Sequence, residues 1–145
     1  MKYWLTVHYP MSTAERHAEW RYWIFLKKRR NLRARDRVFI YETETNPSYV
    51  EGNRTITRPP GRKAVIALVR AVGEVRQHDG GPEVLEDGRV HYWNFVAETE
   101  LERECYIPLD ELRQALEMPG WCARIFGGLM ELPEAQFNRI LARCR

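Results

Sequence analysis

The apolar residues of this chain come in short runs separated by glycine, proline and charged residues, and this spacing most limits what it can fold into. The longest uninterrupted run covers residues 64–69, far below the ~20 residues that a membrane-spanning helix needs. Short runs rich in Val, Ile, Tyr, Phe and Trp are typical of β-strands. We therefore expect a globular protein built largely from short strands.

The pattern of side chains places these strands along the chain. Strands are predicted at residues 3–9, 37–42, 64–75, 90–105 and 129–131. In the first of them, alternation puts Trp4, Thr6 and His8 on one face. Helices are predicted from Ser12 or Thr13 toward residue 20, after Pro108 for about three turns, and after Pro133. The connection at residues 43–62 is rich in turn-forming residues, which indicates a long hairpin connection or a flap.

Strands and short helices that do not alternate regularly favour an α+β class. The expected architecture is a small closed or nearly closed barrel with helices packed at its ends. A length of 145 residues fits one domain spanning residues 1–145.

Charge and cysteine content narrow the function classes. The net charge is only +3, but residues 27–35 gather six of the 23 basic side chains, so positive charge is local. Cys105, Cys122 and Cys144 form no Cys-x-x-Cys pair, which argues against a zinc site and against a disulfide framework. The start of the chain lacks the pattern of a signal peptide, so we expect a cytoplasmic protein.

The aromatic content is high, with 5 Trp, 7 Tyr and 5 Phe. Such rings fill the core of a small barrel or face a ligand, and composition alone leaves both uses open.

Several fragments in order resemble the EVE family, particularly its short stand-alone microbial members. They are Met1-Lys2-Tyr3-Trp4-Leu5, the Trp20 region leading to Asn31-Leu32-Arg33, Asp36-Arg37-Val38-Phe39-Ile40-Tyr41, Val72-Gly73-Glu74-Val75, and Phe126-Gly127-Gly128-Leu129-Met130-Glu131-Leu132-Pro133-Glu134. Two positions depart from the family. Arg35 stands where the family has glycine before Asp36, so a different turn is expected there, and Trp20-Arg21-Tyr22 replaces Trp-Gly-Val.

The resemblance implies a PUA-like mixed β-barrel of about five to six strands flanked by short helices. This fold is shared with the YTH readers of methylated adenine and the SRA readers of 5-methylcytosine. It further implies a non-catalytic, monomeric module that uses no metal or cofactor. Such a module binds DNA or RNA by holding a flipped, modified base, such as a methylated cytosine or adenine, in an aromatic pocket.

By this resemblance the pocket lies between the first strand, the Trp20 segment, the second strand and the segment before Gly127. Its candidate residues are Trp4, Thr6, Trp20, Tyr22, Trp23, Tyr41, Thr43, Arg124 and Phe126, with Trp20 the strongest. Basic side chains suit phosphates, and the candidates for that role are Lys27, Lys28, Arg29, Arg30, Arg33, Arg35, Arg54, Arg58, Arg62 and Lys63. The simpler alternatives are core packing for Trp4 and Trp23 and a solvated face for the charged run.

Two other functions stay open. An amidohydrolase of the related ASCH type would need a lysine or glutamate base in the pocket, and Lys63 is the only lysine after Lys28. A protein-interaction module would use exposed aromatic side chains. The four histidines form no metal or nucleophile motif, and Glu98, Glu100, Glu102 and Glu104 are interpreted as a solvated strand face.

Overall fold

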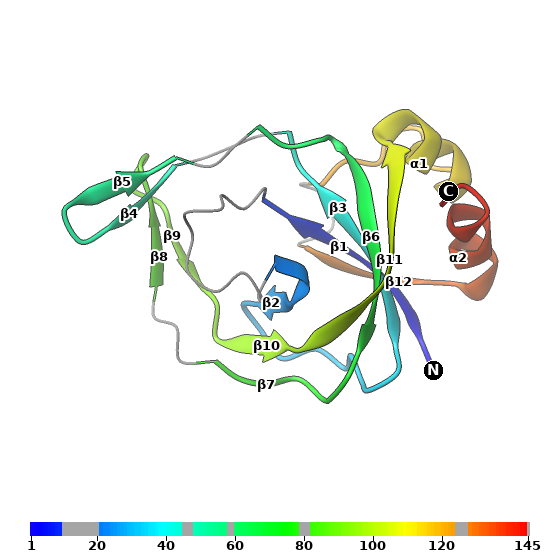
Figure 1. Ribbon diagram of the computed structural model, residues 1–145, viewed down its shortest axis with the longest axis horizontal. Coiled ribbons are helices and arrows are strands. Elements are labelled where there is room, and N and C mark those ends of the chain that lie inside the picture. Colours follow the sequence, from blue (N-terminus) through cyan, green and yellow to red (C-terminus); the bar gives the residue numbers. More distant parts are fainter. Residues whose placement is uncertain (10–20, 45–47, 58–59, 79–81, 124–127, 145) are drawn as a thin grey trace.

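The computed structural model describes residues 1–9, 21–44, 48–57, 60–78, 82–123 and 128–144. Within these ranges the chain is mostly β-structure with two helices. Figure 1 shows the helices on the outer side of the largest sheet and two smaller sheets on its other side. This arrangement agrees with the predicted α+β class.

The largest sheet has five strands in the order β11-β6-β3-β1-β12. The strands are β1 (Tyr3–His8), β3 (Arg37–Glu42), β6 (Ala64–Ala71), β11 (Thr99–Pro108) and β12 (Leu129–Leu132). β1 pairs in parallel with β3, while the other neighbours are antiparallel. The strands expected at residues 3–9, 37–42 and 129–131 are thus confirmed within one residue at each end, while the strand expected at residues 64–75 ends at Ala71.

Two smaller sheets complete the β-structure. One has the order β2-β10-β7 and the other β5-β4-β8-β9. Their strands are β2 (Ile24–Leu26), β10 (Phe95–Ala97), β7 (Arg76–Gln77), β4 (Tyr49–Glu51), β5 (Arg54–Ile56), β8 (Pro82–Leu85) and β9 (Val90–Tyr92). The connection at residues 43–62 therefore contains the β4–β5 hairpin.

The prediction of a single strand at residues 90–105 was wrong. This segment divides into β9, β10 and the first part of β11, and each belongs to a different sheet. The chain changes hydrogen-bonding partners at Trp93-Asn94 and again at Glu98, so continuous alternation in sequence does not mean one continuous ladder. Across the described ranges the strands form three sheets and no closed barrel, which corrects the expected closure with about five to six strands.

The two helices, α1 (Leu109–Leu116) and α2 (Glu134–Leu141), each begin after a proline. Asp110 and Glu111 lie in the first turn of α1, where carboxylates interact favourably with the helix dipole. The helix is shorter than the expected three turns because Glu117 adopts a left-handed conformation with φ 56°. Within the described ranges, no helix has the length and apolar character to cross a membrane.

Alternation along β1 divides the core into two layers. Leu5 packs with Phe39 of β3 and Phe137 of α2 on the helix-covered face of the sheet. Trp4 packs with Val38 on the opposite face, together with side chains from the smaller sheets. Because β1 and β3 run in parallel, their carboxyl ends lie together, with the Thr43 amide donating to the His8 carbonyl at 3.0 Å.

Candidate nucleic-acid interface

Two of the predicted pocket rings lie in the hydrophobic core. Trp4 is 1% exposed and Tyr41 is 4% exposed. The Trp4 indole Nε1 donates to Oδ2 of Asp36 at 3.0 Å, and Tyr41 packs edge-on against Trp121 with 5.2 Å between ring centroids. In this structure neither ring has a face on which a base could stack.

Other predicted pocket residues lie near the carboxyl ends of β1 and β3 or beside β2. Thr6 is buried, and its hydroxyl donates to the Gly128 carbonyl at 2.7 Å. Tyr22 is partly exposed, and its hydroxyl donates to Glu104 Oε1 at 3.4 Å. Trp23 and Thr43 are also partly exposed. Trp20, Arg124 and Phe126 fall outside the described residues.

His8 joins this group, although it was not among the predicted pocket residues. It follows Thr6 by two positions on the same face of β1, so the predicted alternation already placed the two together. Burial lowers the pKa of His8 to about 4, and a hydrogen bond with the backbone of Arg21 offsets part of this effect. The imidazole is therefore neutral near pH 7, with one ring nitrogen able to accept a hydrogen bond.

A second group of rings, absent from the predicted pocket, joins the residue after β1 to β9 and the residue that follows β9. This aromatic cluster consists of Tyr9, His91 and Trp93. His91 stacks on Tyr9 with a centroid distance of 6.2 Å and meets Trp93 edge-on at 5.4 Å. All three side chains are partly exposed. Sequence alternation did not show that Tyr9 meets rings more than 80 residues away.

Cations lie beside Trp93 of the aromatic cluster and beside Phe95 of β10. Lys27 Nζ lies 5.7 Å from the centroid of the Trp93 ring, and Arg29 Cζ lies 5.0 Å from that of Phe95. Both contacts are within the range of cation–π attraction. This part of the molecule therefore combines flat apolar faces with positive charge.

An acid–imidazole pair lies beside the same rings. Glu83 of β8 and His91 of β9 are cross-strand partners, and Glu83 Oε1 is 4.0 Å from His91 Nδ1. Their side chains are 20% and 12% exposed, respectively. The pair adds polar groups to a surface that is otherwise aromatic.

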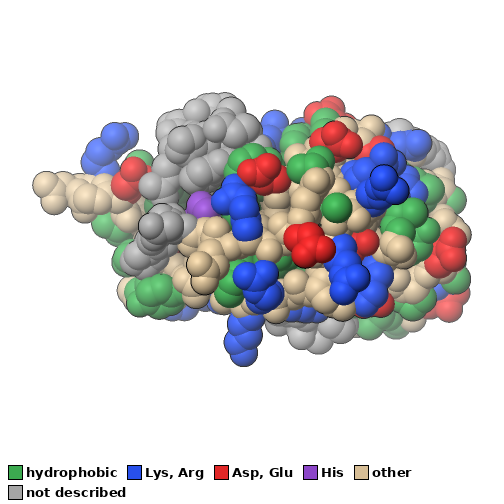
Figure 2. Space-filling view, turned by 90° about the horizontal axis from the view of Figure 1, so that it is seen from below, with side chains coloured by type: hydrophobic (Ala, Val, Ile, Leu, Met, Phe, Trp, Pro, Cys, Tyr) green, Lys and Arg blue, Asp and Glu red, His purple; other side chains and the backbone are tan. Residues whose placement is uncertain are grey.

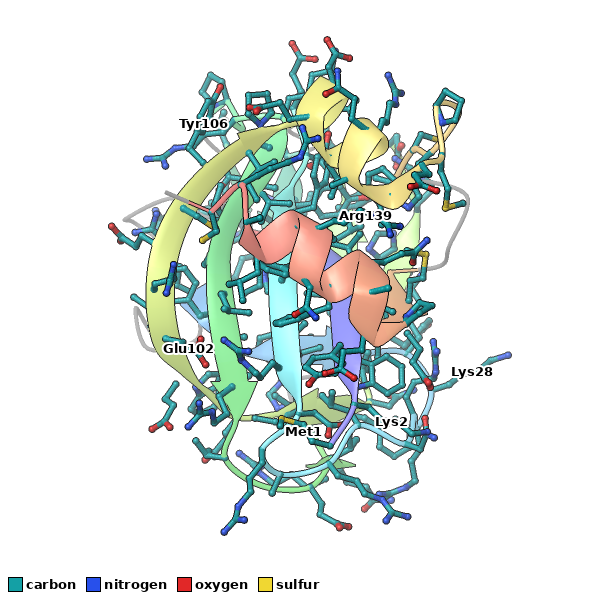
Figure 3. All side chains as sticks on the ribbon, turned by 90° about the vertical axis from the view of Figure 1, so that its right-hand side faces the viewer. Met1, Lys2, Lys28, Glu102, Tyr106 and Arg139 are labelled. Atoms are coloured by element: carbon teal, nitrogen blue, oxygen red, sulfur yellow. The ribbon has the colours of Figure 1, made fainter. Side chains whose placement is uncertain are left out.

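The basic segment at residues 27–35 is anchored at two arginines. Arg29 Nη1 donates to the Val75 carbonyl at 2.9 Å, and Arg30 Nη1 donates to the Leu129 carbonyl at 3.1 Å. The remaining basic side chains of the segment, Lys27, Lys28, Arg33 and Arg35, are exposed. Figure 3 shows Lys28 projecting away from the molecule, well separated from Tyr106 at the upper end.

The other predicted phosphate ligands do not join this segment. Arg62 and Lys63 lie beside the carboxyl end of β3, where the Arg62 amide donates to Glu42 Oε1 at 2.9 Å. Arg33 and Arg35 precede the opposite end of that strand, about 20 Å away for a strand of this length. Arg54 lies on the β4–β5 hairpin, and Arg58 falls outside the described residues.

The glutamates of residues 98–104 are not simply solvated. Glu98 pairs with Arg76 at 2.7 Å, while Glu102 pairs with both Arg37 and Arg70. The hydrogen bond from Arg37 is the main cause that lowers the pKa of Glu102. The arginines therefore balance the charge of Glu98 and Glu102. Figure 2 shows acidic and basic side chains intermixed on the face viewed there.

The described ranges hold no group of three or more His, Cys, Asp or Glu side chains placed to bind a metal ion. No family model matches the chain. A search of the curated proteins found no relative. The resemblance to the EVE family therefore rests on the sequence fragments that run from Met1-Lys2-Tyr3-Trp4-Leu5 to the segment that ends at Glu134.

Proposed function

We propose that this protein is a nucleic-acid-binding module that holds one modified base against aromatic side chains. The observation that supports this most is the pairing of Lys27 with Trp93 and of Arg29 with Phe95. A single-stranded nucleic acid binds such a surface in two ways. Its unstacked bases stack on the aromatic rings, and its phosphates interact with the cations.

Known magnitudes make this combination adequate for binding. Stacking of one base on an aromatic side chain contributes about 1–3 kcal/mol, so two rings supply a useful part of the affinity for a single strand. Basic side chains add a term that weakens steeply with salt. The exposed Lys27 and Lys28 are placed for this second term.

Two parts of the proposal come from the EVE resemblance. They are the recognition of a modified base and the PUA-like fold that would hold it. We place the extruded base between the partly exposed Tyr22 and Trp23 and the carboxyl ends of β1 and β3. There, Thr43 and neutral His8 offer hydrogen bonds to its polar edge. Burial of one methyl group contributes roughly 0.8 kcal/mol, enough for modest discrimination between modified and unmodified bases.

A panel of short DNA and RNA oligonucleotides tests the proposal, each with and without one methylated cytosine or adenine. Fluorescence anisotropy at two salt concentrations should give tighter binding to one modified oligonucleotide, and Trp20→Ala should remove that preference. Equal affinity for modified and unmodified strands would leave a general nucleic-acid-binding protein. Absence of binding to any of them would refute the proposal.

A further inference from the structure

A concavity lies where the basic segment turns into β3. Its volume is about 500 Å³, and its lining residues are Met1, Lys2, Asn31, Arg33, Ala34, Arg35 and Asp36. Figure 3 shows Met1 and Lys2 at the lower end of the molecule, away from α1. We propose that this concavity binds a phosphate group, with Lys2, Arg33 and Arg35 as its cationic ligands. The inference deepens the proposed function and rests on it for the source of the phosphate.

The wall of the concavity is held in place by Asp36. Its Oδ1 accepts from the Lys2 amide at 2.9 Å, and its Oδ2 accepts from the Arg33 amide at 3.0 Å and from the Trp4 indole. Asp36 is 2% exposed. These bonds join the loop at residues 33–36 to β1, so its backbone is fixed before any ligand arrives. Fixing a binding loop in advance lowers the entropy lost on binding.

Arg35 gives the second argument. Its φ is 76°, a left-handed conformation that favours glycine, and its amide donates to the Ala71 carbonyl at 2.8 Å. A different turn was expected where Arg35 replaces the family's glycine, yet the backbone of Arg35 keeps a conformation that favours glycine. A side chain kept at a strained backbone position points to a role for that side chain. For Arg35, that side chain is an exposed guanidinium.

The charges around the concavity favour an anion. Arg33 and Arg35 form no ion pair with any carboxylate in the described part of the chain, whereas Lys2 Nζ lies 3.3 Å from Glu131 Oε1 in an exposed pair. Asp36 also lines the wall, but both of its oxygens already accept hydrogen bonds from N–H groups. Two guanidinium groups suit a phosphate because each donates two parallel hydrogen bonds.

The position of the concavity relates it to the aromatic cluster. The same basic segment begins at Lys27, beside Trp93, and ends at Arg35. We therefore assign bases that flank the extruded base to the Trp93 end, and a phosphate to the Arg35 end, of one bound strand. The phosphate is either an internal phosphodiester or a terminal phosphomonoester, since the two share the chemistry that Arg33 and Arg35 recognise.

Titration with inorganic phosphate, followed by backbone amide NMR shifts, tests the site without nucleic acid. We expect shifts centred on residues 31–36 that are lost in Arg35→Gly and weakened but present in Arg35→Lys, which keeps the charge without the two parallel hydrogen bonds. The glycine variant removes the guanidinium without imposing strain on the fold. Arg89→Gln, which removes an exposed cation paired with Asp87 on the β8–β9 turn, should leave the shifts unchanged. Shifts that are absent, or that persist in Arg35→Gly, would overturn the site.

Oligonucleotide binding then identifies the source of the phosphate. Arg35→Gly should weaken binding about three- to tenfold at low salt and reduce the salt slope by about 1. If the ligand is a terminal phosphomonoester, a 5′-phosphorylated strand binds more tightly than its 5′-hydroxyl counterpart, and Arg35→Gly removes the difference. If it is a phosphodiester, both strands weaken alike. Phosphate shifts without oligonucleotide binding would refute the proposed function and retain the anion site.

Discussion

The indole of Trp4 and the carboxylate of Asp36 form a buried hydrogen bond of 3.0 Å between β1 and the residue before β3. This contact explains why Trp4 faces the interior although it resembles a ligand-binding ring in sequence. Its polar N–H has a partner in the core, so burial leaves no donor unsatisfied. The same carboxylate also binds two backbone amides, which makes Asp36 a structural centre for both segments.

Asp36→Asn should therefore lower the free energy of unfolding by about 2–4 kcal/mol, because an amide group replaces an oxygen that faces N–H donors. Urea denaturation followed by tryptophan fluorescence measures this change. Asp110→Asn is the matched control, since Asp110 is exposed in the first turn of α1, and it should cost less than about 1 kcal/mol. Equal effects of the two variants would contradict the role given to Asp36.

Arg35→Gly should stabilise the protein by about 0.5–1 kcal/mol, because glycine adopts φ 76° without a Cβ clash. Ala34→Gly, in the same loop but not at a positive φ, should instead destabilise by about 0.4–1 kcal/mol through greater freedom of the unfolded chain. Thermal denaturation of the two variants checks both signs. A loss of stability in Arg35→Gly would mean that the arginine side chain holds the loop.

Glu102→Gln should lower stability by about 1 kcal/mol at pH 7, because Arg37 and Arg70 both pair with this carboxylate. The pKa of Glu102 is lowered from 4.5 in the folded protein. Its contribution is therefore complete above pH 4.5 and is lost as the pH falls through the lower folded value. Urea midpoints at pH 7 and pH 3 should show the difference from wild type shrinking. Glu100→Gln, exposed on the same strand, should have little effect at either pH.

His8 should make the protein less stable as the pH falls below neutrality. Its folded pKa is about 4 against 6.5 for an ordinary histidine, so the unfolded chain takes up a proton first. The stabilising contribution is complete above pH 6.5 and declines as the pH drops toward 4, by roughly 1–3 kcal/mol. His8→Gln should flatten this decline in urea titrations at pH 7, 6 and 5. Parallel pH profiles for wild type and variant would place His8 in contact with solvent.

Trp93→Ala should weaken oligonucleotide binding about fivefold or more, because it removes a stacking face beside Lys27. Tyr106→Ala is the matched control, since Tyr106 is 55% exposed on β11 and lies far from Lys28 of the basic segment (Figure 3). Anisotropy titrations of both variants, with circular dichroism to verify folding, make the comparison. Similar losses in the two would mean that exposed rings bind nucleic acid without a specific surface.

Four of the five strands of the large sheet, β1, β3, β6 and β12, were predictable because their side chains obey a simple rule. Residues 64–69 are continuously apolar and form a strand buried on both faces, and alternation in β1 correctly placed Trp4, Thr6 and His8 on one face. The register of a strand and the identity of its partner strand do not follow from this rule. Residues 90–105 alternate throughout, yet three sheets share them, because hydrogen bonding depends on which strands lie nearby and not on local pattern.

The candidate site was less predictable for a related reason. Trp4 lies in β1 and Trp93 directly follows β9. Asp36 supplies a buried partner for Trp4, while Lys27 and His91 lie beside Trp93 on a partly open surface. Sequence spacing does not show that residues 27 and 93 meet. The left-handed conformation of Arg35 was equally hidden in the sequence, since it depends on hydrogen bonds between this loop and distant residues such as Ala71 and Lys2.

β1 lies between β3 and β12 in the large sheet, where Tyr3 pairs with Leu132 from the distant part of the chain. The sheet is incomplete until residues 129–132 have been synthesised, so during translation one edge of β1 has no partner strand. Such an edge exposes backbone N–H and C=O groups that can pair with another chain.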